Sequence, residues 1–251
     1  MLNLENLQAG YGKTEILHGV NLSIPSGAVT VIVGANGSGK STLLKTIAGI
    51  QPKTAGTMTF RGENLGEMPQ QERAKMVAYL PQNRPVPEIT AERLVLHGRF
   101  PYLSYPRRYR KEDFHMARQA METMGILDLA ERRIGTLSGG QRQKVYLAMA
   151  LAQDTPVVLL DEPTTFLDIA HQMQLMKEAR LLAAAGKTVV LVLHDLAMAL
   201  EQGDHLAVLH HGTLLAQGKR EDVYQSGALD QAFGIHLCRM ETPDGWRYYA
   251  K

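Results

Sequence analysis

A glycine-rich turn between a β-branched run and a helical segment places the tightest limit on how this chain can fold. The run Val29 to Val33 has the composition of a buried strand, and a helix is expected over 41–50. Between them lies Gly34-Ala35-Asn36-Gly37-Ser38-Gly39-Lys40-Ser41, which fits G-x-x-x-x-G-K-[ST] in the strand–turn–helix context that this pattern requires. Glycines let the backbone approach a ligand closely, so successive N–H groups and the helix N-terminus would bind phosphate oxygens. The turn therefore predicts a phosphate-binding site.

The side chains of the turn extend the prediction to a triphosphate and a metal ion. Lys40 can reach the β- and γ-phosphates as a point charge, and the Ser41 hydroxyl is placed to bind Mg²⁺. A chance glycine-rich turn is the alternative, but the fit of the whole pattern and of its flanks argues against it. The predicted phosphate-binding residues are Gly34, Asn36, Gly37, Ser38, Gly39, Lys40, Ser41 and Thr42.

Two adjacent carboxylates end a second apolar run. Val157 to Leu160 is followed directly by Asp161 and Glu162. Ligands of parallel sheets bind beyond the carboxyl ends of the strands, so Asp161 would lie near the Mg²⁺. Glu162 points differently because it is one residue further, and it could polarise the attacking water. Alone, this pair would read as a solvated strand end; the glycine-rich turn upstream favours the catalytic interpretation.

The sequence Leu137-Ser138-Gly139-Gly140-Gln141 is the signature of ATP-binding-cassette (ABC) ATPases, and the chain resembles this family. Ser138 and Gln141 also form an S-x-x-Q capping box before a helix expected to begin near Arg142. The two glycines expose the N-terminal amides of that helix, which makes the motif a second anion site. A well-capped structural helix is the simpler interpretation, and both can hold together. In the family, the signature of one subunit closes over the ATP of the other, so the resemblance implies a head-to-tail dimer.

Further positions match the family one by one. The resemblance implies that Tyr11 stacks on adenine, although a surface tyrosine in a turn is the alternative. Gln82 matches the glutamine that reaches Mg²⁺ and the water, and His194 matches the histidine that contacts the γ-phosphate. Asp168 matches the acid of the loop between subunits; Phe166, before it, departs from the small residues usual there. The resemblance covers the chain from about residue 2 to residue 218.

The order of apolar runs predicts an α/β fold. Short β-branched runs that alternate with helical patterns indicate a mostly parallel sheet buried on both faces. As the family implies, this would be a P-loop NTPase core with an antiparallel β-subdomain and an inserted helical subdomain. We expect one nucleotide-binding domain over 1–251. Its core would span about 1–83 and 153–227, the helical insertion with the signature about 84–152, and a tail without a readable motif about 228–251.

Composition excludes some classes of function. The 27 basic and 25 acidic residues nearly balance, which does not suggest a nucleic-acid binder. The single cysteine, Cys238, rules out an internal disulfide and fits a reducing compartment. We see neither a signal peptide nor a run of roughly 20 apolar residues. In a membrane process, another subunit would therefore cross the bilayer, and this chain would bind peripherally at the cytoplasmic face of the membrane.

Two segments resemble one branch of the family. The stretches Asp161 to Gln172 and His97 to Tyr102 look like those of the ATPases that serve iron–siderophore, haem and cobalamin importers. The resemblance implies two many-helix permease subunits and, indirectly, an external substrate-binding protein. A soluble ABC ATPase of translation or DNA repair, and an exporter subunit, remain as alternatives. The basic run Arg107 to Lys111 is either a solvated face or a contact with permease or acidic lipid.

Overall fold

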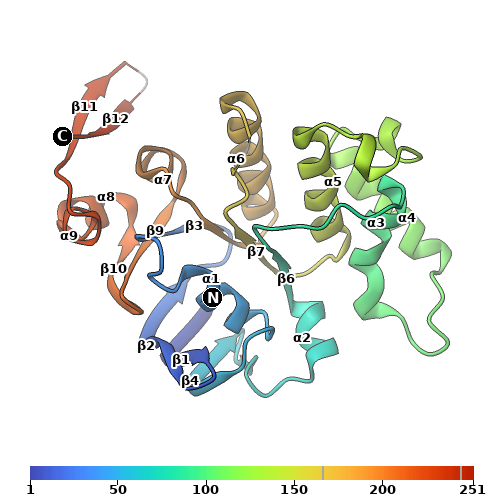
Figure 1. The fold of residues 1–251 in the computed structure, drawn as a ribbon, viewed down its shortest axis with the longest axis horizontal. Helices are drawn as coiled ribbons and strands as arrows, with labels where there is room; N and C mark the ends of the chain where they lie inside the picture. The colour runs from blue at the N-terminus through green and yellow to red at the C-terminus, as the bar shows by residue number, and fades with distance from the viewer. Residues whose placement is uncertain (166, 244) are drawn as a thin grey trace.

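Two β-sheets pack against each other in the computed structural model, which describes residues 1–165, 167–243 and 245–251 (Figure 1). Among these residues, the larger sheet has the strand order β10-β9-β3-β8-β7-β6, and only the β9–β10 pair is antiparallel. Its strands are β3 (Val29–Val33), β6 (Val77–Leu80), β7 (Val157–Asp161), β8 (Thr188–Val192), β9 (His205–His210) and β10 (Thr213–Lys219). The smaller, antiparallel sheet has the order β2-β1-β4-β5. Its strands are β1 (Leu2–Tyr11), β2 (Thr14–Ile24), β4 (Lys53–Phe60) and β5 (Glu63–Asn64).

The larger sheet separates two hydrophobic cores because successive side chains of a strand point to opposite faces. In β7, Val158 and Leu160 join the core with the helical insertion and α6, whereas Val157 and Leu159 join the core with the antiparallel sheet and α1. All five residues of β3, β7 and β8 are buried. Burial on both faces explains why these strands are continuous apolar runs rather than alternating ones.

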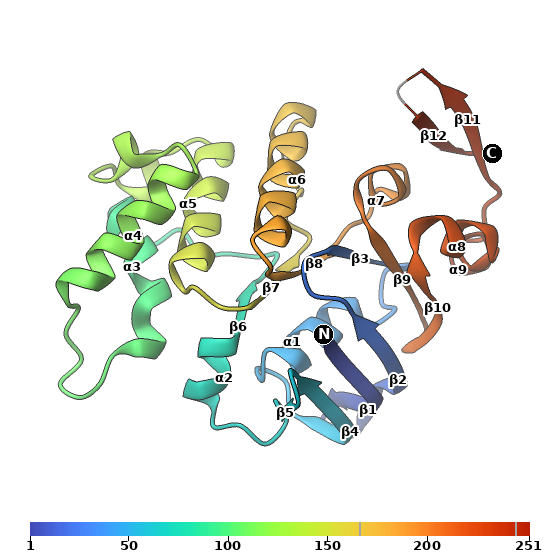
Figure 2. The same ribbon diagram turned by 180° about the vertical axis from the view of Figure 1, so that it is seen from behind.

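The helices form groups along the sheet (Figure 1). Three helices follow strands of the core: α1 (Lys40–Ile47), α6 (Ile169–Ala184) and α7 (Leu196–Gln202). A short helix precedes β6: α2 (Gln70–Met76). The helical insertion contains α3 (Ala91–Leu96), η1 (His97–Tyr102), α4 (Lys111–Thr123), η2 (Leu127–Leu129), η3 (Ile134–Thr136) and α5 (Gly139–Ala152). Figure 2 shows α3, α4 and α5 grouped at one end of the molecule, with the C-terminal hairpin at the other. None of the helices in the described ranges has the length and apolar character that a membrane span needs.

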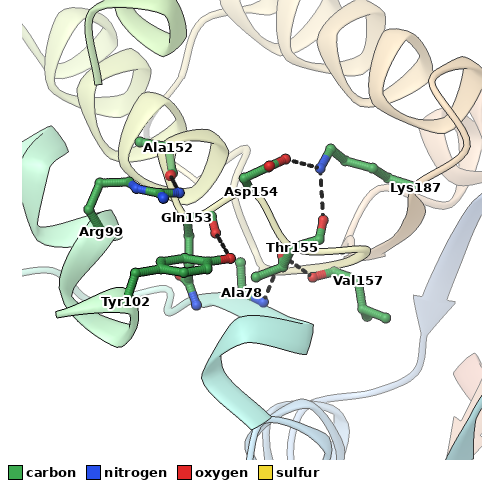
Figure 3. Close-up of polar contacts among 9 residues, drawn as sticks. All are labelled: Ala78, Arg99, Tyr102, Ala152, Gln153, Asp154, Thr155, Val157 and Lys187. Atoms are coloured by element: carbon green, nitrogen blue, oxygen red, sulfur yellow. Dashed lines mark hydrogen bonds and ion pairs between the residues drawn. The ribbon is translucent and has the colours of Figure 1, made fainter. Parts of the chain in front are cut away.

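Hydrogen bonds hold the C-terminal end of α5 and the residues that follow it in place (Figure 3). Arg99 donates to the Ala152 carbonyl at 2.9 Å, and the Tyr102 hydroxyl donates to the Gln153 carbonyl at 2.9 Å. Both donors satisfy carbonyl groups that a helix C-terminus leaves free. On the other side, Lys187 donates to Thr155 O at 2.8 Å and pairs with Asp154 at 3.1 Å. These contacts tie the helical insertion to the start of β7, whose other end carries the predicted carboxylates.

The last residues form two helices and a hairpin that pack onto the main core. These elements are α8 (Arg220–Gln225), α9 (Ala228–Phe233), β11 (Leu237–Thr242) and β12 (Gly245–Ala250). Arg239 of the hairpin binds Glu221 of α8 through two contacts of 2.7 Å. Its guanidinium also lies 4.2 Å from the ring centroid of Trp246 and 4.9 Å from that of Tyr224.

The expected α/β fold class is confirmed, with local differences. The helix after the glycine-rich turn spans Lys40–Ile47 rather than 41–50, because Gly49 takes the left-handed conformation with φ 75° and ends it. The helix after the signature begins at Gly139 rather than near Arg142, since Ser138 is its N-cap. The expected strands at Val29 to Val33 and Val157 to Leu160 are present, and a hairpin across His211 and Gly212 joins β9 to β10. Phe166 lies outside the described residues.

Candidate active site

The glycine-rich turn after β3 has a backbone that side chains would disrupt. Gly37 and Gly39 have φ of 77° and 101°, in the left-handed region that favours glycine. A methyl group on Gly34 would lie 2.1 Å from Leu209 O and 2.7 Å from Ser38 Oγ, so no larger residue fits there. Ser38 Oγ is buried and has no hydrogen-bond partner among the described residues. A loop with close backbone packing and a donor to spare suits a phosphate group.

Lys40 begins α1 and turns back across the loop. Its Nζ donates to the carbonyls of Gly34 at 2.8 Å and Ala35 at 3.0 Å. Burial lowers the pKa of this amine, and the negative charges of Glu162 and Asp161 oppose that shift. The loop therefore holds the Lys40 ammonium group near the carboxylates of Glu162 and Asp161.

One open pocket adjoins the turn. Tyr11, at the end of β1, lines it and is 47% exposed. Its other lining residues are Ile16, Asn36, Gly37, Gly39, Lys40, Ser41, Thr42 and Glu162. The structure thus brings the predicted adenine-stacking residue to the same pocket as the predicted phosphate-binding residues.

Asp161 ends β7 beside the start of α1. It accepts hydrogen bonds from Ser41 Oγ at 3.1 Å and from the Tyr79 hydroxyl at 3.0 Å. Burial raises the pKa of Asp161, although both hydrogen bonds favour its charged form. Burial also raises the pKa of Tyr79 above its ordinary value, with the Asp161 charge adding to the effect.

The donor set around Asp161 fits Mg²⁺. One carboxylate and one hydroxyl at the edge of a phosphate-binding loop are hard oxygen ligands, and Mg²⁺ commonly takes one or two protein oxygens together with substrate phosphates. The described residues hold no group of three or more His, Cys, Asp or Glu side chains arranged for a metal. The site therefore suits a cation that arrives with a phosphate better than one held by protein alone.

Glu162 points away from Asp161 because its backbone turns. Its φ of 48° is a left-handed value that a residue without special constraint rarely adopts. The carboxylate is 8% exposed; Oε2 accepts a hydrogen bond from Gln82, and Oε1 lies 2.6 Å from His194 Nε2. The structure therefore brings together the residues predicted to be catalytic, Glu162, Gln82 and His194.

A hydrogen-bond network connects the Gln82 segment to α5. Arg84 donates to Pro81 O at 2.8 Å and to the side chain of Gln143. Gln143 in turn donates to Pro163 O at 2.8 Å, next to Glu162. Burial lowers the pKa of Arg84 to about 10, and the nearby Tyr146 opposes that shift. This network joins the segment of Gln82 and the segment after Glu162 to the helix of the signature turn.

The signature turn forms the predicted capping box at the start of α5. Ser138 Oγ accepts from Gln141 N at 3.2 Å, and the Gln141 side chain accepts from Ser138 N at 3.1 Å. A methyl group on Gly139 would meet no atom within 4 Å, so this face of the turn is open. Gly139 lines a second pocket together with Gln82 and Glu162. Gly140 and Asp168 do not line the pocket of the glycine-rich turn; Asp168 caps α6 instead, accepting from His171 N at 2.8 Å.

Sequence reasoning missed several residues that support this site. Tyr79, Arg84 and Gln143 contact predicted residues or their neighbours, yet belong to no motif. Tyr79 had a usable signal, since it lies three residues before Gln82 on an apolar strand.

Comparisons with known proteins agree with this geometry. The sequence profile of the family described as ABC transporter matches residues 17–165. The ferric enterobactin transport ATP-binding protein of Escherichia coli is 39% identical, over 95% of this chain and 89% of its own length. The iron(3+)-hydroxamate import ATP-binding protein of Bacillus subtilis is 42% identical, over 93% of this chain and 88% of its own.

Solved structures are similar over the same length. A metal-chelate type ABC transporter in an inward-facing conformation has a TM-score of 0.86 and 25% identity, and the match covers 100% of this chain and 97% of that one. A dimeric bacterial ABC transporter cassette has a TM-score of 0.74 and 29% identity, with 88% of this chain and 99% of that one covered.

Proposed function

The chain belongs to the ABC transporter family, and we propose that it is the ATP-hydrolysing subunit of a membrane importer for an iron chelate, working as a head-to-tail dimer. The observation that carries the proposal is the convergence of Gln82 and His194 on Glu162, which lines the pocket that Lys40 and the glycine-rich turn form. In this arrangement, a carboxylate, an amide and an imidazole would lie beside the expected position of the γ-phosphate.

Each of these groups has a role in phosphoryl transfer to water, a reaction in which positioning and electrostatic stabilisation supply most of the rate. Glu162 orients the attacking water and accepts its proton. Gln82 holds that carboxylate in place, and His194 contributes a donor to the γ-phosphate. The N–H groups of the turn and Lys40 stabilise negative charge on the phosphates, while Tyr11 stacks on the adenine.

Ser41 and Asp161, with Gln82, would hold Mg²⁺. The bound ion would neutralise charge on the β- and γ-phosphates. Asp161 has the role of a ligand rather than a base, because its carboxylate faces the Ser41 and Tyr79 hydroxyls and not the Glu162 side.

The second half of the site comes from another copy of the chain. Ser138, Gly139, Gly140 and Gln141 present an open helix N-terminus that suits an anion, and Asp168 caps the neighbouring helix α6. In a head-to-tail pair, these residues of one subunit would close over the ATP bound by its partner. The dimeric cassette among the similar structures supports a dimer.

The names of the relatives support the class of cargo. They include a siderophore transport protein of Bacillus subtilis and a hemin import protein of Gloeobacter violaceus. We assign an iron–siderophore, haem or related cobalamin substrate, a many-helix permease and an external substrate-binding protein. The chain would act at the cytoplasmic face of the membrane. Within it, 84–152 would be the insertion that meets the permease, 1–83 and 153–227 the core, and 228–251 the tail.

Purification of the chain from its native membranes in mild detergent tests this function. A many-helix permease that copurifies at a one-to-one ratio supports the importer. Recovery only in the soluble fraction, alone or with ribosomes or DNA, contradicts the transport role and favours the translation or repair alternative.

A further inference from the structure

His171, in the first turn of α6, lies between the two segments proposed to face the partner subunit. Its Nδ1 is 2.7 Å from Asp168 Oδ1, and its backbone N–H donates to the same oxygen at 2.8 Å. The backbone N–H of His171 and then its imidazole lower the pKa of Asp168. An ionised carboxylate can only accept, so Nδ1 carries the proton in this contact.

The opposite edge of the imidazole packs against the signature turn. A methyl group on Gly140 would lie 2.8 Å from His171 Nε2 and 2.9 Å from Cδ2. The same addition at the neighbouring Gly139 would meet nothing within 4 Å. The imidazole of His171 therefore occupies the space that a side chain at Gly140 would need, so a larger residue there would displace the ring.

The tautomer of His171 suits this packing. Nδ1 holds the proton, so Nε2 presents a lone pair to the first turn of α5. That turn carries free N–H groups and the positive end of the helix dipole, which a lone pair complements.

Three charged groups surround the imidazole. Asp168 binds Nδ1, while Lys144 of α5 and Glu178 of α6 line the same crevice between the two helices. Burial raises the pKa of Glu178. The hydrogen bond from Gln174 and the charge of Lys144 oppose this shift, so the Glu178 carboxylate already has partners other than His171.

We propose that His171 is a positioning residue that holds the signature turn against the Asp168 loop, so that both segments meet the partner's ATP as one rigid surface. The proposal rests on the head-to-tail dimer described above.

The test is the rate of ATP hydrolysis by the purified full-length chain at saturating ATP. His171→Ala should reduce turnover by roughly ten- to a hundredfold, since misplacement by about 1 Å can cost that much. In His171→Gln the amide oxygen reaches the position of Nε2 and can accept from the same N–H groups. This variant should keep turnover within about threefold of the wild type.

His115→Gln, which replaces an exposed histidine on α4, is the matched control and should keep the wild-type rate. Full activity of His171→Ala, or a loss in His171→Gln as large as that in His171→Ala, would overturn the proposal.

A double-mutant cycle on thermal stability tests the contact without using activity. Gly140→Ala should lower the melting temperature in the wild type and have a much smaller effect in the His171→Ala background, where the clashing ring is gone. Equal effects in both backgrounds would contradict the contact.

The dependence of activity on protein concentration separates the two proposals. Specific activity of the wild type should rise with concentration if hydrolysis needs a dimer. If the specific activity of His171→Ala rises in the same way and reaches the same rate, the role of His171 is contradicted and the dimer is not. No rise in the wild type contradicts the head-to-tail site, and the role of His171 with it.

Discussion

His194 Nε2 lies 2.6 Å from Glu162 Oε1, and the two residues come from the carboxyl ends of neighbouring parallel strands. The histidine side chain is 48% exposed, whereas that of Glu162 is 9% exposed. The exposed imidazole of His194 therefore contacts the buried carboxylate of Glu162. This geometry lets one group contact phosphate while the other acts on water.

Replacement of His194 should impair chemistry more than binding. We expect His194→Ala to lower turnover by about 10²- to 10³-fold, the usual effect of losing one preorganised donor to a developing charge. Most contacts with ATP would remain, so affinity should change little. Steady-state hydrolysis together with equilibrium binding of a fluorescent ATP analogue measures both. A loss confined to affinity would contradict the role of His194.

Lys40 should control nucleotide binding itself. Its Nζ lies in the loop between two carbonyl groups and is the buried cation nearest the predicted phosphates. Lys40→Ala should therefore weaken ATP binding by at least about tenfold, or roughly 1.4 kcal/mol, as isothermal titration calorimetry would measure. Lys177→Ala, at an exposed position of α6, is the control. Unchanged affinity in Lys40→Ala would count against the phosphate-binding loop.

Gly34 should be intolerant of any side chain even without nucleotide. A methyl group there would lie 2.1 Å from Leu209 O, a backbone atom that cannot turn aside. We expect Gly34→Ala to lower the free energy of unfolding by about 1–3 kcal/mol, the cost of forcing an atom into a packed region. Gly139→Ala, where space is open, should be nearly neutral in the same urea titration. Equal stability of the two variants would contradict the close packing.

Acid should release the C-terminal hairpin from α8. The Arg239 guanidinium holds the pKa of Glu221 below its ordinary value, with Gln225 contributing a hydrogen bond. Because the folded-state pKa is depressed, this stabilisation is complete above the unfolded pKa of about 4.3 and is lost as pH falls through the folded value.

Trp246 reports this contact because it is the only tryptophan in the sequence and lies 4.2 Å from the Arg239 guanidinium. Its fluorescence should stay constant from pH 7 to about pH 5 and change at lower pH, where the Glu221 carboxylate becomes protonated. In Glu221→Gln the change should already be present at pH 7. Glu122→Gln, at an exposed position of α4, should behave as the wild type. A wild-type signal that does not vary with acid would contradict the contact.

Features written in adjacent residues could be predicted from the sequence. The capping box of Ser138 and Gln141 follows from spacing alone, as does the strand–turn–helix around Gly34. The divergence of Asp161 and Glu162 was expected from their order, but its cause, a left-handed backbone at Glu162, has no sequence signal because non-glycine residues seldom adopt it.

Contacts between distant segments could not be predicted in this way. Arg84 and Gln143 are 59 residues apart, and their contact depends on how α5 lies against the Gln82 segment. The packing of His171 on Gly140 likewise depends on the placement of two helices, which periodicity does not determine. The helix and strands of 228–251 could not be predicted, because the strands are short and the Arg239–Glu221 pair joins separate elements.

The most direct test of the account is ATP-dependent assembly of Glu162→Gln. This change removes the carboxylate that acts on water but keeps the shape of the site, so ATP should bind without being consumed. We predict no measurable turnover, ATP affinity close to that of the wild type, and a stable dimer by size-exclusion chromatography with light scattering when ATP and Mg²⁺ are present. Normal steady-state hydrolysis by Glu162→Gln would contradict the assignment of Glu162, and a monomer with ATP bound would contradict the head-to-tail site.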